Sequence, residues 1–134
     1  MKRANPFPSV SLLLPNEIAE DTDAKVASYW KSDDTCLLQI SSFLREQGPQ
    51  VSAMQRLSER TRAGGKWEPV DLSFTIEGCD VAGASTKDDE GTSWVHAYLV
   101  WEWVAVHATV SRQGEVSQCD WAWNALSSIR PVIM

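Results

Sequence analysis

The chain has 134 residues, of which 43% are hydrophobic and 22% are charged, a composition typical of one globular domain. No apolar run approaches the roughly 18 residues that a membrane-spanning helix requires. The net charge of −6, from 12 basic and 18 acidic residues, disfavours a nucleic-acid-binding protein, because such proteins neutralise phosphates with Lys and Arg. A basic protein partner fits this charge better.

The first eight residues contain two prolines, which cannot donate backbone hydrogen bonds, so we expect residues 1–8 to form a flexible arm. Met1-Lys2-Arg3 resembles the start of a signal peptide. However, the apolar run Val10–Leu14 that follows is short, and the segment lacks a small-residue cleavage site. We therefore expect a cytoplasmic protein whose single domain covers residues 9–134.

The domain is expected to begin with a strand at Ser9–Leu14. Asn16 is a suitable N-cap for a short helical turn that ends at Glu20, and the polar residues 20–23 predict a loop.

Two strand-like runs, Ala24–Lys31 and Thr35–Leu44, flank Ser32-Asp33-Asp34 and predict a hairpin. A helix over residues 35–46 is the alternative.

Pro49 is well placed to begin a helix that runs to about Arg62, because Gly64-Gly65 can end it. The inward stripe of this helix is expected to contain Val51, Met54, Leu57 and Ser58. Residues 66–76 predict one or two short extended pieces.

The small and polar segment Gly78–Gly91 predicts a weak strand at Val81–Ser85 and a mobile acidic turn, Asp88-Asp89-Glu90. Near the end of the chain, Asp120 is the expected cap of a helix over Trp121–Ile129. Its shared face consists of Ala122, Ala125, Leu126 and Ile129.

The stretch Ser93–Arg112 is too long for one strand, since 20 extended residues would span roughly 66 Å. A reversal at Trp101-Glu102 with an even number of loop residues pairs Val100 with Trp103 and His96 with His107. A four-residue loop is an equal alternative to a two-residue one. The even loop gives the hairpin two distinct faces. One is aliphatic, with Val95, Ala97, Leu99, Val104, Val106, Ala108 and Val110, and the other carries Trp94, His96, Tyr98, Val100, Trp103, Ala105, His107 and Thr109.

Both faces of this hairpin are too apolar to be open to water, so helices are expected to cover both sides of the sheet. The predicted fold class is therefore α+β, a single-domain α/β/α sandwich with a central antiparallel sheet.

The element order resembles the PsbP-like α/β/α sandwich, which includes the bacterial DcrB-type proteins. The resemblance rests on a first strand that ends in Leu14-Pro15, the tryptophan-rich hairpin, and the ending Leu126 to Pro131, L-S-S-I-R-P. It implies a bacterial protein that acts by binding, as do the chaperones and immunity proteins of toxin secretion systems. DcrB-type proteins often carry a lipobox cysteine, and this chain has none near its start.

No residue pattern predicts catalysis, a metal or a cofactor. His96 and His107 would face each other, but zinc needs a third and usually a fourth ligand, which their predicted neighbours do not supply. The sequence contains neither a Gly-x-Ser-x-Gly motif nor a phosphate-binding loop. The three cysteines, Cys36, Cys79 and Cys119, have no Cys-x-x-Cys spacing and are expected to be reduced.

Aromatic residues at the hairpin tip and two acidic clusters are the predicted contacts with a protein partner. We interpret the protein as an immunity protein that masks a cognate secreted toxin, with its acidic loops against a basic cleft. The alternative is a chaperone or adaptor that holds an apolar segment of a secreted effector, and the third hypothesis is a small enzyme. The predicted binding residues are Asp33, Asp34, Asp88, Asp89, Glu90, Trp101, Glu102 and Trp103.

Overall fold

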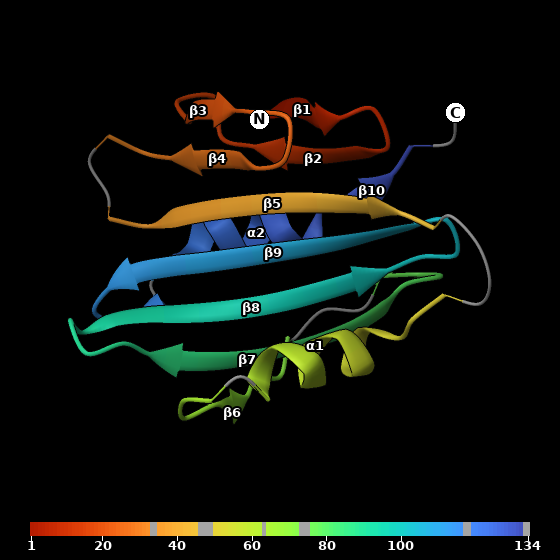
Figure 1. Ribbon diagram of the computed structural model, residues 1–134. Helices are drawn as coiled ribbons and strands as arrows, with labels where there is room; N and C mark the ends of the chain where they lie inside the picture. Colours follow the sequence, from red (N-terminus) through yellow and green to blue (C-terminus); the bar gives the residue numbers. More distant parts are fainter. Residues whose placement is uncertain (33–34, 46–49, 63, 73–75, 117–118, 133–134) are drawn as a thin grey trace.

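A computed structural model describes residues 1–32, 35–45, 50–62, 64–72, 76–116 and 119–132. Within these ranges the chain forms two antiparallel sheets and two short helices, a mostly-β fold of the α+β class (Figure 1). The predicted class and the central antiparallel sheet are therefore confirmed.

The larger sheet has seven strands in the order β3-β4-β5-β9-β8-β7-β6, and the smaller has three in the order β1-β2-β10. The elements are β1 (Lys2–Phe7), β2 (Val10–Leu14), β3 (Ala19–Thr22), β4 (Ala27–Trp30), β5 (Leu37–Leu44), α1 (Ala53–Thr61), β6 (Glu68–Pro69), β7 (Asp80–Lys87), β8 (Thr92–Val100), β9 (Val104–Gln113), α2 (Asp120–Ser127) and β10 (Arg130–Pro131).

The central hairpin is formed by β8 and β9, as predicted, but the chain reverses one residue later than predicted, at Glu102-Trp103. Val100 pairs with Ala105, and the Trp101 backbone N–H donates to the Val104 carbonyl at 2.9 Å. Every pair is therefore shifted by two residues from the predicted register, so His107 lies opposite Tyr98 and not His96. A shift of two residues preserves the faces, which is why their prediction holds.

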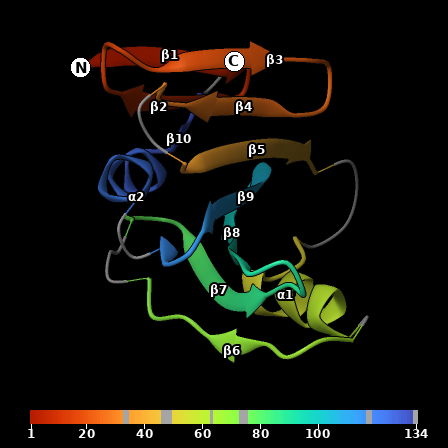
Figure 2. The ribbon, with the colours of Figure 1, turned by 90° about the vertical axis from the view of Figure 1, so that its left-hand side faces the viewer.

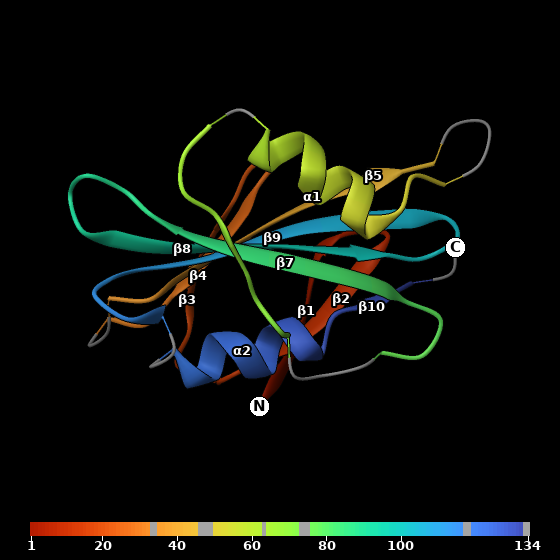
Figure 3. The same ribbon diagram turned by 90° about the horizontal axis from the view of Figure 1, so that it is seen from below.

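The aliphatic face of the hairpin lies in the main core. Val95, Val106 and Val110 are at most 2% exposed and pack with side chains from β2, β4, β5 and α2. On the opposite face, Tyr98, Val100 and Ala105 form a second cluster with Ala53 and Leu57 of α1. The two helices lie on opposite sides of the large sheet (Figures 2 and 3). The layer that contains α2 is completed by the small sheet, because β2 supplies Val10, Leu12 and Leu14 to the core.

The predicted hairpin in the first half is confirmed, since β4 pairs antiparallel with β5. The first helix begins later than predicted, at Ala53, with Ser52 as its N-cap, and the Ser52 hydroxyl accepts from the Gln55 N–H. Its inward stripe was predicted incorrectly in part, because Ala53 is buried and Met54 is 62% exposed. The predicted weak strand is the eight-residue interior strand β7.

The prediction of a flexible arm over residues 1–8 is wrong. Residues 2–7 form β1, which pairs with β2 from Lys2 opposite Leu14 to Phe7 opposite Val10. Pro6 is tolerated because β1 is an edge strand and because the register is irregular between Ala4 and Phe7, and Pro8 lies in the turn after the strand.

The predicted helical turn at residues 16–20 and loop at residues 20–23 are also replaced. A turn closed by Ile18 N–H and the Pro15 carbonyl leads directly into the edge strand β3. Strand β3 pairs with β4 over its whole length, and this pairing overrides its weak strand propensity.

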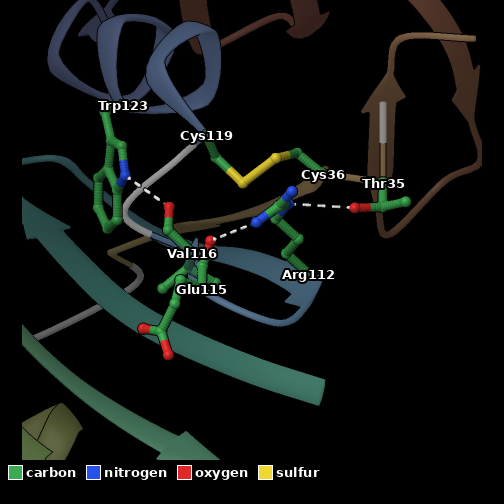
Figure 4. Close-up of a disulfide and its surroundings, with 7 residues drawn as sticks. All are labelled: Thr35, Cys36, Arg112, Glu115, Val116, Cys119 and Trp123. Atoms are coloured by element: carbon green, nitrogen blue, oxygen red, sulfur yellow. Dashed lines mark hydrogen bonds between the residues drawn. A yellow bond between two sulfur atoms is a disulfide. The ribbon is translucent and has the colours of Figure 1, made fainter. Parts of the chain in front are cut away.

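Cys36 and Cys119 form a disulfide, so the prediction that all three cysteines are reduced is wrong (Figure 4). Cysteine spacing did not reveal it, because the two residues are 83 positions apart and only the fold brings them together. The bond joins the start of β5 to the N-terminal end of α2, and both cysteines are at most 2% exposed. Of the described cysteines, Cys79 is free.

Neither described helix combines the length and the apolar character needed to cross a membrane.

Candidate functional site

The β8–β9 turn and the adjacent end of β5 expose a group of large apolar side chains, which we call the tryptophan end. Trp103 is 63% exposed, Leu44 is 66% exposed and Phe43 is 48% exposed. Leu44 lies beside the turn that carries Trp103, because it pairs with Val104 across β5 and β9. Phe43 pairs with Ala105, so its side chain points to the opposite face of the sheet. Monomeric proteins rarely expose such residues in a group without a function.

Beside the tryptophan end lies a mainly apolar cavity of about 960 Å³. Its walls come from the β1–β2 turn, the end of β5, the β8–β9 turn and β10, which meet at one end of the molecule (Figure 1). Phe7, Leu44, Trp101, Trp103 and Val132 supply most of the large apolar lining. A cavity of this size and lining is typical of a ligand or peptide site.

The turn that carries Trp103 is held by several contacts. The Gln50 side-chain amide donates to the Trp101 carbonyl at 3.0 Å, and Arg56 donates to the Gln50 side-chain oxygen at 3.2 Å. The Arg45 backbone N–H donates to the Trp103 carbonyl at 3.0 Å, and its guanidinium carbon lies 4.5 Å from the Trp103 ring centroid. The exposed indole is therefore pre-positioned, which lowers the entropic cost of binding.

The three predicted binding residues of this turn differ in exposure. Trp101 is only 8% exposed and belongs to the main core, so it contributes a wall of the cavity. Glu102 and Trp103 are exposed.

The predicted acidic turn connects β7 to β8, and one of its carboxylates is part of the turn itself. Asp88 accepts hydrogen bonds from the backbone N–H groups of Glu90 and Thr92 and from the Trp94 indole, at 2.9 to 3.2 Å. The Thr92 backbone N–H and then the indole lower the pKa of Asp88. Asp88 therefore stabilises the turn, and Asp89 and Glu90 are the exposed carboxylates that remain available to a partner.

The acidic turn and the tryptophan end lie at opposite ends of β8, one before Thr92 and the other after Val100 (Figure 1). The structure thus separates two groups of residues that the sequence interpretation combined. Asp33 and Asp34 lie outside the described residues.

A stack of aromatic side chains crosses the sheet beneath α1. His96 Nδ1 and His107 Nε2 are 3.0 Å apart, and Tyr98 is stacked on His107 with ring centroids 4.7 Å apart. Arg60 of α1 donates from Nε to the Tyr98 hydroxyl at 2.7 Å. The predicted proximity of the two histidines is confirmed, although they are diagonal neighbours.

The environment of the histidine pair holds both rings neutral at pH 7. Burial, followed by the positive charge of Arg60, lowers the pKa of His96 to about 4. The same causes, together with His96, lower the pKa of His107 to about 3. Among the described residues, no three His, Cys, Asp or Glu side chains are grouped so that they could hold a metal ion.

We expect His96 and His107 to make the folded protein less stable at mildly acidic pH. The unfolded chain binds protons at its histidines near pH 6.5, whereas the folded pair binds them only near pH 3–4. Above about pH 6.5 the histidines are neutral in both states and do not change the free energy of unfolding. As the pH falls below that value, protons bind to the unfolded chain first and lower the free energy of unfolding. Between pH 7 and pH 5 the free energy of unfolding should decrease by up to roughly 4 kcal/mol, measured by urea denaturation.

The matched control is the His96→Gln/His107→Gln double variant, whose free energy of unfolding should vary much less over the same range. If the wild-type protein and the variant have equal slopes between pH 7 and pH 5, the histidine pair is not the cause.

Phe43, Leu44 and the residues of the β1–β2 turn were not predicted as part of a site. Phe43 and Leu44 stand out in the sequence as apolar residues just before the charged Arg45, but the proximity of Leu44 to Trp103 depends on the β5–β9 register. Phe7 and Pro8 were assigned to a flexible arm.

No protein-family model matches the chain, and no curated protein matches it. Among solved structures, it is similar to a Bacteroides thetaiotaomicron protein whose crystal structure was determined at 1.50 Å resolution. The TM-score is 0.57 at 14% sequence identity, over 92% of this chain. The match spans 45% of that protein, less than half of its length. At this identity the similarity shows the fold alone.

Proposed function

We propose that this chain is a non-enzymatic binding protein that holds an apolar segment of a partner polypeptide at the tryptophan end. The observation that carries the proposal is that the exposed side chains of Trp103 and Leu44 both line an apolar cavity of about 960 Å³. Fixed aromatic side chains next to an apolar pocket are typical energetic centres of protein interfaces. Of the two binding roles expected from the sequence, the adaptor role fits this geometry better.

The immunity role is the second candidate, and the exposed carboxylates of Asp89 and Glu90 favour it. In that role the acidic turn meets a basic cleft of a toxin, and its charges act mainly on the association rate. Asp89→Ser and Glu90→Ser together test this role without removing the internal acceptor Asp88.

We also propose that the chain has the PsbP-like fold and that it resides in an oxidising compartment. An antiparallel sheet with α1 and α2 on opposite faces supports the fold assignment. The Cys36–Cys119 disulfide favours an oxidising compartment over the cytoplasm that we expected from the sequence, because cytosolic thiols are kept reduced.

The test uses a library of random peptides displayed on phage and selected on the folded protein. We expect enriched peptides to contain an apolar segment. Leu44→Asp, at an exposed residue of the tryptophan end, should weaken the binding of a selected synthetic peptide by about tenfold or more, because it places a charge in the apolar contact. The measurement is the Kd from fluorescence anisotropy of the labelled peptide.

Met54→Asp is the matched control, since Met54 is an apolar residue of similar exposure (62%) that does not line the cavity. It should leave the Kd unchanged, and both variants should keep the wild-type Tm. Equal peptide affinity for the wild-type protein and Leu44→Asp would refute the proposed site.

A further inference from the structure

A second cavity, of about 370 Å³, lies between the edge strand β1 of the small sheet and the edge strand β3 of the large sheet, which Figure 1 shows on the same side of the molecule. Five consecutive residues of β1, from Lys2 to Pro6, line one wall. Glu20 and Thr22 of β3 and Tyr29 of β4 complete it. The cavity is therefore a slot between two unpaired strand edges.

The most informative group in this slot is the Tyr29 hydroxyl. Tyr29 is 0% exposed, and its hydroxyl has no hydrogen-bond partner among the described residues. The Thr22 side chain is close enough to favour the ionised form but lies outside hydrogen-bond geometry. Burial and then the negative charge of Glu20 raise the pKa of Tyr29 to about 12, so the hydroxyl is a proton donor at neutral pH. A buried donor without an acceptor is costly, which points to a group that binds it.

Three charged residues, Lys2, Arg3 and Glu20, line the same slot, and Arg3 donates to the Ser11 hydroxyl at 3.4 Å. The Lys2 ammonium donates to the Ile18 carbonyl at 3.3 Å, and this bond uses one of its three hydrogens. No ion pair joins Lys2 to Glu20 within the described part of the chain, where the ion pair is Lys31 with Glu17. A simple anion would meet the negative charge of Glu20, and a simple amine would meet the positive charge of Lys2.

We propose that this slot binds a small zwitterion of the free amino acid type. Its carboxylate accepts hydrogen bonds from the Tyr29 hydroxyl and the Lys2 ammonium, and its ammonium donates to the Glu20 carboxylate. The volume is within the range of small-molecule sites, and the site is independent of the tryptophan end.

Calorimetric titration of the full chain tests this proposal, with each of the proteinogenic L-amino acids as a probe at constant ionic strength. Propionate and propylamine are the single-charge probes. We expect saturable binding of at least one amino acid and affinities at least about tenfold weaker for both single-charge probes. Failure of every amino acid to bind, or equal affinity for propionate or propylamine, would overturn the proposal.

Variants of the slot give the second readout. Tyr29→Phe should lower the affinity for the amino acid by about tenfold. It should keep the wild-type Tm, because the hydroxyl that it removes has no hydrogen-bond partner among the described residues of the free protein. Glu20→Gln should also lower this affinity, whereas Asp21→Asn, the same charge change at the neighbouring residue outside the slot, should not. If Tyr29→Phe binds the amino acid with wild-type affinity, or if its Tm is several degrees below that of the wild-type protein, the Tyr29 hydroxyl is not a ligand-binding group.

Discussion

Breaking the Cys36–Cys119 disulfide should lower the free energy of unfolding by about 4 kcal/mol. The bond closes a loop across 83 residues of sequence, and a crosslink of that span removes a large amount of conformational entropy from the unfolded chain. It also joins β5 to α2, two elements that both contribute to the main core. Urea denaturation of the Cys36→Ala/Cys119→Ala variant against the wild-type protein measures the effect.

Cys79→Ser is the matched control, because Cys79 is a free cysteine outside the disulfide. It should change stability far less, and it should remain sensitive to prolonged reduction in denaturant, as the wild-type protein is. If the double variant unfolds at the same urea concentration as the wild-type protein, the disulfide does not stabilise this fold.

Val106→Asp should be the most destabilising single substitution considered, with a loss of more than about 4 kcal/mol. Val106 is 0% exposed on the aliphatic face of β9, where its neighbours are core side chains without a partner for a carboxylate. The expected result is a protein that is largely unfolded at 37 °C, as followed by circular dichroism and thermal denaturation.

Val106→Thr separates the effect of charge from that of shape, because threonine keeps the branched side chain and adds one hydroxyl. It should melt between the wild-type protein and Val106→Asp. A soluble Val106→Asp protein with the wild-type Tm would mean that the two faces of the hairpin have been assigned to the wrong sides.

The central hairpin was predictable because side chains alternate along a strand. A loop of any even length places Val95 and Val106 on one face and His96 and His107 on the other, so the faces did not depend on the turn geometry. The position of the turn did determine the pairs, and residues 101–103 carry no Asn-Gly signal that distinguishes a reversal at Trp101-Glu102 from one at Glu102-Trp103.

The edge strands were not predictable from local sequence. Strand β1 contains Pro6, and β3 is short and acidic, so each has weak strand propensity. Both are held by pairing with a neighbour, β2 in one case and β4 in the other. Since edge strands gain from charges and prolines that prevent association with other chains, their composition resembles that of loops.

The candidate site was predicted only in part, because long-range strand pairing brings its residues together. Trp103 was identified from its place in the turn, but Leu44 joins it through long-range pairing, and Trp101 proved to be a core residue. The acidic turn was identified as exposed, whereas the internal role of Asp88 follows from the hydrogen bonds of the folded turn.

The measurement that tests the proposed function most directly is a nuclear magnetic resonance titration of the tryptophan indole N–H signals with a selected peptide. The chain has seven tryptophans, and two of them report on opposite ends of β8. Trp103 marks the tryptophan end, and Trp94 donates to Asp88 in the acidic turn. Binding at the tryptophan end predicts a saturable shift of the Trp103 signal and an unchanged Trp94 signal. A shift of Trp94 with an unchanged Trp103 would contradict the account and place the partner at the acidic turn.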